Sequence, residues 1–333
     1  MELMDGAAKS TQTQLAEVVL SHSTGNIPVP ALIAEAGEQT RERFFEFFAA
    51  QIRNRNTRSA YLQATHQFFV WCDAQRLSLI QIRPVHVAAY IEGKQRELSA
   101  PSIKQHLAGL RVLFNWLVLG QVIPNNPALF VKGPKFSRQV GVTPILEAEQ
   151  MRQLLDSIES TSVKGLRDRA AIALMVYTFA RASAITSLRR ADYRTAGKRS
   201  QLRLQEKGGK EKLLWLHHRA EEYLDRYLEA AEITYGEAPL FQSMDKRHRL
   251  TGQPMDRRDL LRAVKQRCAH AGLPDTICNH SFRGTGITVF LQNGGSLEVA
   301  QDIANHSDPR TTKLYDRRKD LATLSEIERR IAF

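Results

Sequence analysis

Apolar side chains between residues 38 and 130 recur at three- and four-residue spacing beside polar neighbours, as is typical of amphipathic helices. The spacing is clearest between residues 57 and 75, a stretch rich in aromatic side chains. Pro84 stands where it favours the first turn of another helix. The pattern predicts helices over residues 44–52, 57–75, 84–98 and 99–120. Together these helices would form one compact bundle that ends near residue 130.

The pattern after residue 145 mixes helical and alternating stretches. Apolar density along residues 166–190 predicts a buried central helix. Alternating stretches at 200–206 and 210–218 flank a Gly-Gly pair that suits a tight turn between two strands. Helical spacing is found at 147–158, 219–233, 257–272, 281–295, 296–306, 309–321 and 324–333. The sequence therefore predicts a mainly α fold with a small antiparallel β-hairpin or sheet in its C-terminal part.

Two segments without apolar periodicity divide the chain. Residues 1–37 interrupt short apolar runs with glycine and proline, which indicates an N-terminal extension. Residues 131–144 contain two prolines, two glycines and three basic residues, which is typical of a linker. We therefore expect a helical domain at 38–130 and a second domain at 145–333.

Net charge is the unusual feature of the composition. The 333 residues include 47 Lys and Arg against 35 Asp and Glu, which gives a net charge of +12. This charge is −3 over residues 1–37, +8 over 38–144 and +7 over 145–333. An excess shared by two folded regions favours a polyanionic partner such as nucleic acid. Ordinary solvated lysines and arginines would explain the charge equally well.

Cysteine usage and hydropathy indicate the cellular compartment. The three cysteines, Cys72, Cys268 and Cys278, form no CxxC pair, so neither a disulfide framework nor a zinc site is indicated. The N-terminus lacks the basic start of a signal peptide, and no apolar run approaches the roughly 18 residues of a membrane span. We therefore expect a cytoplasmic protein that has no membrane partner.

Several polar residues near the C-terminus are weak signals when taken singly. His280 and Arg283 are three residues apart and share a face if their segment is helical. Pro309 favours the start of a helix, so His306 would precede a helix N-terminus, where backbone amides attract an anion. Tyr315 would then lie about two turns into that helix. A surface pair or a core tyrosine would account for each of these residues.

Two earlier residues complete an ordered series. Arg181 follows the apolar central helix, and Lys207 stands at the turn of the predicted hairpin. The full series, which resembles the active site of the tyrosine recombinases or phage integrase family, is Arg181, Lys207, His280, Arg283, His306 and Tyr315. The helices of residues 38–130 similarly resemble the core-binding domain of that family. The resemblance implies a two-domain, Xer-like site-specific recombinase or integrase.

The resemblance also implies a reaction. Tyr315 would attack a DNA phosphodiester to give a 3′-phosphotyrosyl link and a free 5′-hydroxyl, and the hydroxyl of a partner strand would reverse the step. Arg181 and Arg283 would bind the phosphate, because guanidinium is always charged and binds two oxygens at once. His306 would add a hydrogen bond to the phosphate. His280 would help to take the phenolic proton.

Two positions in this series leave alternatives open. Lys207 would protonate the leaving 5′-oxygen, and Lys210 is the alternative because hairpin boundaries shift by a few residues. Lys207 is preferred because it precedes the glycine pair in the manner of the family. Many relatives carry an acid three residues after the first arginine, where this chain has Ala184. That departure puts the orientation of Arg181 in question unless another group replaces the acid.

No cofactor and no metal are expected. The phosphotyrosine bond keeps the energy of the broken phosphodiester, so resealing needs neither ATP nor a metal ion. The sequence contains no GxxxxGK[ST] loop, no HExxH motif and no evident carboxylate cluster for paired metals. The KGGK stretch at 207–210 lacks the spacing of a nucleotide-binding loop.

Further basic residues are candidates for contacts with DNA phosphates. They are Arg53, Arg55, Arg58, Lys104, Arg111, Arg189 and Arg190. A solvated polar face explains each of them as well. The terminal stretch 324–333 carries an apolar stripe that would dock on a neighbouring protomer or fold back on its own domain.

The expected partner is double-stranded DNA that carries specific recombination sites. The two domains would clamp this DNA as a homotetramer on two synapsed segments, with monomers free in solution. The expected location is the nucleoid of the cytoplasm. Two alternatives stay open, which are DNA relaxation of the type IB topoisomerase kind and non-catalytic regulation by DNA binding.

Overall fold

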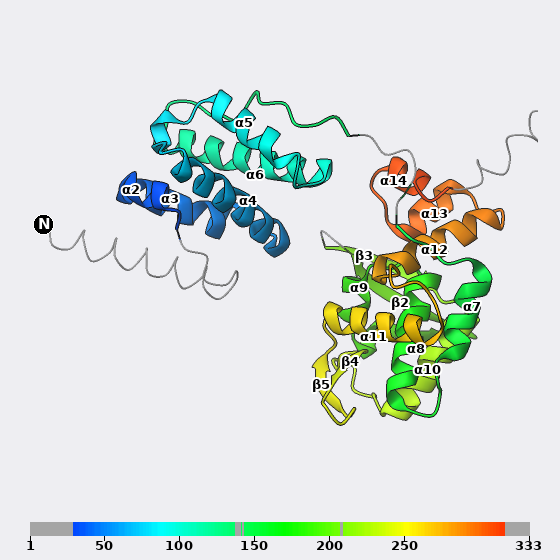
Figure 1. Cartoon of the computed structure of the whole chain (residues 1–333). Coiled ribbons are helices and arrows are strands. Elements are labelled where there is room, and N and C mark those ends of the chain that lie inside the picture. The colour runs from blue at the N-terminus through cyan, green and yellow to red at the C-terminus, as the bar shows by residue number, and fades with distance from the viewer. Residues whose placement is uncertain (1–28, 137–140, 142, 207–208, 317–333) are drawn as a thin grey trace, which may run out of the picture. The chain divides into compact units, whose positions relative to one another are not determined.

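The computed structural model describes residues 29–136, 141, 143–206 and 209–316 (Figure 1). The chain divides into two compact units, with the boundary between Ser137 and Arg138. Each unit has a hydrophobic core of its own.

The first unit consists of helices. They are α2 (Ala31–Glu35), α3 (Glu38–Glu46), the π-helical η1 (Phe47–Gln51), α4 (Arg55–Ala74), the 3₁₀ turn η2 (Leu79–Gln81), α5 (Pro84–Lys94) and α6 (Ala100–Leu119). The two long helices, α4 and α6, pack against each other. Phe68 and Phe114 meet edge to face between them, with ring centroids 5.9 Å apart. The predicted helical bundle is therefore present.

The ends of these helices follow from local sequence. The side chain of Asn54 accepts two backbone amide hydrogen bonds and so caps α4. Pro84 occupies the first turn of α5, as predicted. Helix α2 falls within the segment expected to be an extension, and its Leu32 and Ile33 are buried in the core of the first unit.

The second unit is built around the buried helix α8 (Val163–Tyr177). Its other helical elements are α7 (Ala148–Ser157), α9 (Ala182–Thr186), η3 (Arg190–Asp192), α10 (His218–Ala231), α11 (Arg257–His270), α12 (Asn279–Gln292), α13 (Leu297–Ala304) and α14 (Pro309–Lys313). Helices α7, α9, α10, α11 and α12 all contact α8. This arrangement explains the apolar density of the α8 sequence.

The predicted buried central helix is present, but it is shorter than the stretch of residues 166–190 that indicated it. Helix α8 ends at Tyr177, and Phe179 has a φ of +53°, a conformation that no right-handed helix contains. The hydroxyl of Thr178 donates to the backbone carbonyl of Leu174 at 2.6 Å. The chain therefore turns before α9, with Arg181 at the N-cap of that helix.

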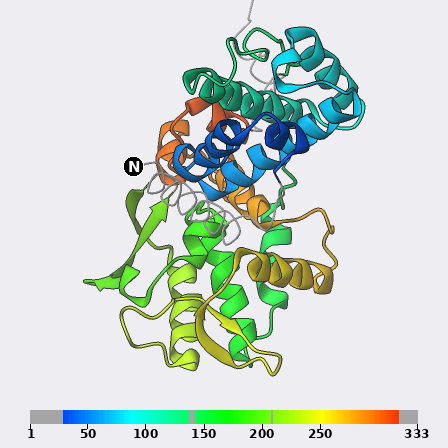
Figure 2. The same cartoon turned by 90° about the vertical axis from the view of Figure 1, so that its left-hand side faces the viewer.

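Two small antiparallel sheets complete the second unit. Strands β1 (Tyr193–Ala196), β2 (Arg199–Glu206) and β3 (Lys210–Trp215) pair in this order, and β4 (Gln242–Met244) pairs with β5 (Leu250–Pro254). Figure 2 shows the three-stranded sheet, in green, at one side of the helices of this unit. The predicted hairpin is confirmed, and its register pairs Glu206 with Lys210.

Strands β1, β4 and β5 were not predicted, because three to five residues are too few to display a period of two. The expected class, mainly α with a small antiparallel sheet, is confirmed. No helix within the described residues is long and apolar enough to cross a membrane.

Candidate active site

Five residues of the predicted series lie at one place in the second unit. Arg181 caps α9, His280 and Arg283 lie in the first turns of α12, and two further residues flank α14. These two are His306, between α13 and α14, and Tyr315, just after α14. Lys207 lies outside the described residues. Its alternative, Lys210, is exposed at the start of β3.

The Tyr315 side chain is buried, and its hydroxyl lies 2.9 Å from Nε2 of His280. The prediction that Tyr315 lies inside a helix is wrong, because α14 ends at Lys313. The hydroxyl of Thr288 donates to the Tyr315 carbonyl at 3.1 Å, and the Gly141 amide donates to the carbonyl before it at 3.0 Å. These long-range partners take the carbonyls that a longer helix would use.

His306 is fixed on both sides of its ring. Its Nδ1 lies 2.9 Å from the hydroxyl of Thr312, a fully buried residue of α14. Its ring lies 7° from parallel to the ring of Tyr315, with centroids 6.2 Å apart. Thr312 was not predicted, since a single threonine in a short helix carries no recognisable signal. The contact leaves Nε2 as the ring nitrogen able to meet a ligand.

Arg283 is the largest fully buried side chain in the described part of the chain, with 1% of its surface exposed. Its two terminal nitrogens donate to the backbone carbonyls of Phe179 and Ala304, the latter at 2.5 Å. Its Nε has no partner among the described residues. The guanidinium therefore joins α12 to the break after α8 and to the end of α13.

Arg181 forms an ion pair with Glu206, the last residue of β2. The arginine side chain is 34% exposed, whereas the Glu206 side chain is 4% exposed. Glu206 was not among the predicted site residues. Burial in β2 alternates, with Ser200, Leu202 and Leu204 buried, and this period places residue 206 on the inward face. This alternation along β2 is the signal that could have identified Glu206 as an inward-facing carboxylate.

Burial sets the protonation of the cluster. Burial lowers the pKa of His280, and the charges of Arg283 and Arg181 lower it further. Burial and the same two arginines, together with His280, lower the pKa of His306 from 6.5 to about 4. Burial raises the pKa of Tyr315, an effect that the two arginines oppose. Burial, and then Arg181, lowers the pKa of Arg283 to about 10, which keeps it charged at neutral pH.

The cluster therefore combines two permanently charged guanidiniums, two imidazoles that are neutral at pH 7 and a buried phenol. Such a set can hold an anion while a neutral imidazole accepts the proton of the phenol. No group of three His, Cys, Asp or Glu side chains able to hold a metal ion occurs among the described residues.

Three candidate DNA contacts lie near the start of α4. Arg53 and Arg55 are exposed. Arg58 is partly buried, and its Nε donates to the backbone carbonyl of Ile52 at 2.9 Å. The structure thus leaves the first two side chains facing solvent.

Two further candidates belong to α6. Lys104 is exposed, with its ammonium 5.9 Å from the centroid of the Phe136 ring. The Arg111 guanidinium donates to the backbone carbonyls of Ala128, at 3.2 Å, and Val131, at 2.5 Å. Arg111 therefore holds the end of the first unit against α6.

The last two candidates follow α9 and do not join the cluster. Arg189 forms an exposed ion pair with Glu237. Arg190 donates to the backbone carbonyl of Tyr193 at 2.9 Å and lies over its ring at 5.7 Å.

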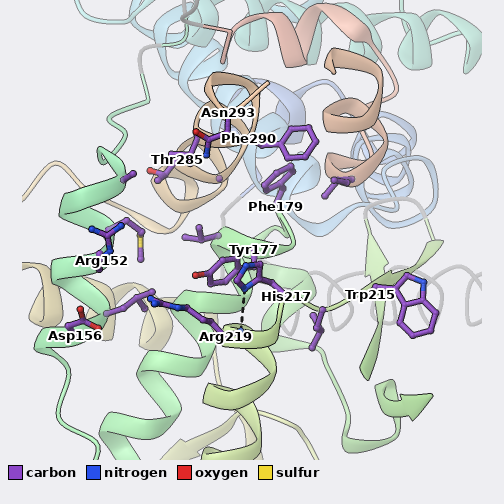
Figure 3. Close-up of a pocket in the computed structure, with 18 of the residues that line it drawn as sticks. Arg152, Asp156, Tyr177, Phe179, Trp215, His217, Arg219, Thr285, Phe290 and Asn293 are labelled. Carbon is purple, nitrogen blue, oxygen red and sulfur yellow. Dashed lines mark hydrogen bonds between the residues drawn. The ribbon is translucent and has the colours of Figure 1, made fainter. Parts of the chain in front are cut away.

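A separate cavity of about 660 Å³ lies in the second unit (Figure 3). In its wall Tyr177 stacks on His217 with ring centroids 4.4 Å apart, and the Arg219 amide donates to His217 Nδ1 at 3.2 Å. The Phe179 side chain lines it, while the Phe179 carbonyl serves Arg283. None of the five clustered side chains lines this cavity, so it is distinct from the cluster.

Comparison with protein families gives two matches. Residues 144–321 match the Phage integrase family, and residues 41–123 match the Phage integrase, N-terminal SAM-like domain. The first match alone covers more than half of the chain.

Curated relatives match over most of their length. Tyrosine recombinase XerC of Leptospira interrogans is 26% identical over 292 residues, which cover 86% of this chain and 91% of the relative. Tyrosine recombinase XerD of Chlorobaculum tepidum is 26% identical over 287 residues, which cover 84% and 92%.

Solved structures share the fold. The XerH site-specific recombinase bound to palindromic difH substrate in a post-cleavage complex has a TM-score of 0.66 and 18% identity, covering 95% of this chain and 94% of its own. A lambda integrase tetramer bound to a Holliday junction has a TM-score of 0.62 and 17% identity, covering 92% and 86%.

Proposed function

The chain belongs to the phage integrase family of tyrosine recombinases, and from this membership we propose that Tyr315 is the nucleophile with which it cleaves DNA. The enzymes of this family cleave and rejoin DNA, and the function of this chain is site-specific recombination. The observation that carries the proposal is the buried Tyr315 hydroxyl 2.9 Å from the Nε2 of His280, beside two arginines.

The first step forms a bond between the Tyr315 oxygen and the scissile phosphorus. The phenolic proton passes to Nε2 of His280, which is neutral at pH 7 because burial and two arginines lower its pKa. As the bond from phosphorus to the 5′-oxygen breaks, Lys207 donates a proton to that oxygen. The products are a 3′-phosphotyrosyl link and a free 5′-hydroxyl.

The phosphate gains negative charge as the tyrosine attacks. Arg181 and Arg283 oppose this charge with guanidinium donors, and the unpartnered Nε of Arg283 is one donor that DNA would satisfy. His306 adds a hydrogen bond from Nε2, because Thr312 holds its Nδ1. These groups are preorganised by backbone contacts, so the transition state needs little rearrangement.

Rejoining reverses these steps on a different strand. The 5′-hydroxyl of the partner strand attacks the phosphotyrosine, its proton returns to Lys207, and the Tyr315 oxygen leaves with a proton from His280. The bond broken equals the bond formed, so neither ATP nor a metal ion enters the reaction.

DNA binding is assigned to both units. The charge of +8 over residues 38–144 and +7 over 145–333 supports a clamp on the phosphate backbone. Arg53, Arg55 and Lys104 are exposed, and we assign contacts with DNA phosphates to their side chains. Two synapsed DNA segments would hold four copies of the chain, in the manner of the lambda integrase tetramer, while the free chain is a monomer in the cytoplasm.

A nicked suicide substrate tests this proposal, once the cognate site has been found by sequencing DNA trapped on the protein. We expect a covalent adduct that Tyr315→Phe abolishes while duplex binding persists. The matched control is Tyr235→Phe, which alters a tyrosine that is 71% exposed in the same unit. An adduct in Tyr315→Phe would show that another residue is the nucleophile.

The same substrate separates the alternatives. A wild type that binds the cognate site but never forms an adduct would be a regulator. Relaxation of supercoiled DNA without strand exchange between two sites would indicate topoisomerase activity. Family membership favours neither of these results.

A further inference from the structure

Among the residues that the structure describes, Glu206 is the one carboxylate paired with an arginine of the cluster. Its Oε2 pairs with Nη1 of Arg181, and its side chain is 4% exposed. We propose that Glu206 is a positioning residue, which orients the Arg181 guanidinium toward the scissile phosphate. The inference rests on the proposed function, because it assumes that Arg181 contacts that phosphate.

The burial of Glu206 argues for a specific role. A carboxylate taken out of water needs a charged or hydrogen-bonding partner, and Arg181 supplies it. Without this partner Arg181, whose side chain is 34% exposed, would sample several rotamers. A reaction step that requires one orientation would then lose conformational entropy. The ion pair selects one of these orientations.

The backbone around Glu206 is well suited to fix a partner. Glu206 ends β2 on its inward face, and its register partner across the hairpin is Lys210. Helix α9, which begins directly after Arg181, packs against β2. The two residues of the ion pair therefore belong to elements that contact each other, so the position of β2 fixes the orientation of the Arg181 guanidinium.

Ala184 explains why the carboxylate that orients Arg181 comes from β2. It lies one turn after Arg181 on α9, is 2% exposed and carries no polar atom in its side chain. Helix α9 therefore offers Arg181 no carboxylate from that position. Glu206 supplies the missing charge from a neighbouring element.

Glu206 also balances the charge of the cluster. Its negative charge opposes the lowering of the Arg283 pKa that burial and Arg181 produce. Two guanidiniums side by side repel each other, and one carboxylate reduces that repulsion while leaving a net positive charge for the phosphate. The pair stabilises the arrangement of both arginines before DNA arrives.

The test is a double-mutant cycle of Glu206→Ala and Arg181→Ala, read as single-turnover adduct formation on the nicked substrate at saturating protein. Glu206→Ala should lower the rate constant roughly 10- to 100-fold, as loss of an orienting partner commonly does, with the dissociation constant for duplex DNA unchanged. In the Arg181→Ala background it should have no further effect. Glu206→Gln, which is nearly isosteric, should lie between Glu206→Ala and the wild type.

Two further variants separate positioning from other effects. The control Glu211→Gln removes an exposed carboxylate from the same hairpin and should cleave like the wild type. Ala184→Glu in the Glu206→Ala background returns a carboxylate to α9 and should restore part of the lost rate. Thermal melting shows whether each variant folds, and Glu206→Gln carries the test if Glu206→Ala does not.

Several outcomes would overturn the inference. Equal losses from Glu206→Ala with and without Arg181 would mean a merely structural role. Faster cleavage by Glu206→Gln would mean that the carboxylate obstructs the phosphate. A wild type that forms no Tyr315-dependent adduct would instead refute the proposed function, and this result is visible before any Glu206 variant is compared.

Discussion

Gly284 leaves room for the Tyr315 ring, and Gly284→Ala should slow DNA cleavage without unfolding the protein. A Cβ at residue 284 of α12 would lie 3.2 Å from Cε1 of Tyr315 and 3.0 Å from Cγ2 of Ile145. Both distances are shorter than ordinary van der Waals contact, so each neighbour must move by a few tenths of an ångström. Ile145 is partly buried and Tyr315 belongs to a buried hydrophobic cluster, so the two side chains would share the displacement.

The magnitude follows from that displacement. The Tyr315 hydroxyl lies 2.9 Å from Nε2 of His280, and a shift of about 0.5 Å brings the pair to the limit of a hydrogen bond. A misplacement of 1 Å can cost roughly 100-fold in rate, so we expect about a 10-fold slower adduct formation. Stability should change little, because alanine favours the helix by about 1 kcal/mol and overpacking costs about 1–3 kcal/mol.

Gly109→Ala is a matched control, since its Cβ would meet Cδ1 of Tyr61 at 3.1 Å in the core of the first unit. Both variants crowd a tyrosine ring, and only one ring belongs to the cluster. The assay is single-turnover cleavage at saturating protein, with thermal melting of both variants. If Gly284→Ala and the wild type cleave at equal rates and melt at equal temperatures, the position of the Tyr315 ring does not determine the cleavage rate and the reasoning is refuted.

Three other predictions concern protonation and charge. His306→Gln should reduce acid sensitivity: the folded state lowers the pKa of His306 from 6.5 to about 4, so the unfolded chain binds more protons in this window and stability falls as pH falls. The loss, about 2 kcal/mol after screening by solvent, should be absent from His306→Gln in melting curves from pH 7.5 to 4; equal slopes would contradict it. Arg283→Lys should lose about 1–3 kcal/mol of stability and most adduct formation, because an ammonium cannot serve two backbone carbonyls and the phosphate; wild-type melting would count against this. Lys207→Ala should slow cleavage, and a 5′-sulfur leaving group, which needs no proton, should restore it; the same rescue in Lys210→Ala instead would reverse the assignment.

The sequence reveals the residue types of the cluster because phosphoryl chemistry demands them. A phosphate that gains charge calls for guanidinium, and a phenol that loses a proton calls for a base near neutral pH. Arg181, Arg283 and His280 could be named without coordinates because, with Lys207, His306 and Tyr315, they form an ordered series that resembles the active site of the family. Hairpin and helix positions followed from periodicity, with errors where elements were short, as in β4.

The errors share a physical cause, which is that elements end where distant partners satisfy their backbone. Tyr315 lies outside α14 because Thr288 and Gly141 bond to carbonyls there. Phe179 holds a φ of +53°, and its carbonyl accepts from Arg283, 104 residues away. None of these three partners is visible in the local sequence, since a pattern of apolar residues specifies the middle of a helix better than its end.

The cluster is assembled almost entirely from such ends. Arg181 caps α9, Glu206 ends β2, His306 follows α13 through the left-handed Asn305, and Tyr315 follows α14. A side chain at an element end can turn toward a neighbouring element, whereas one in the middle of a helix is committed to one face. The left-handed residues cost about 1 kcal/mol each, and the contacts of the cluster offset this cost. Substitutions that loosen these ends should therefore reduce cleavage more than stability, because the main core of the second unit lies around α8.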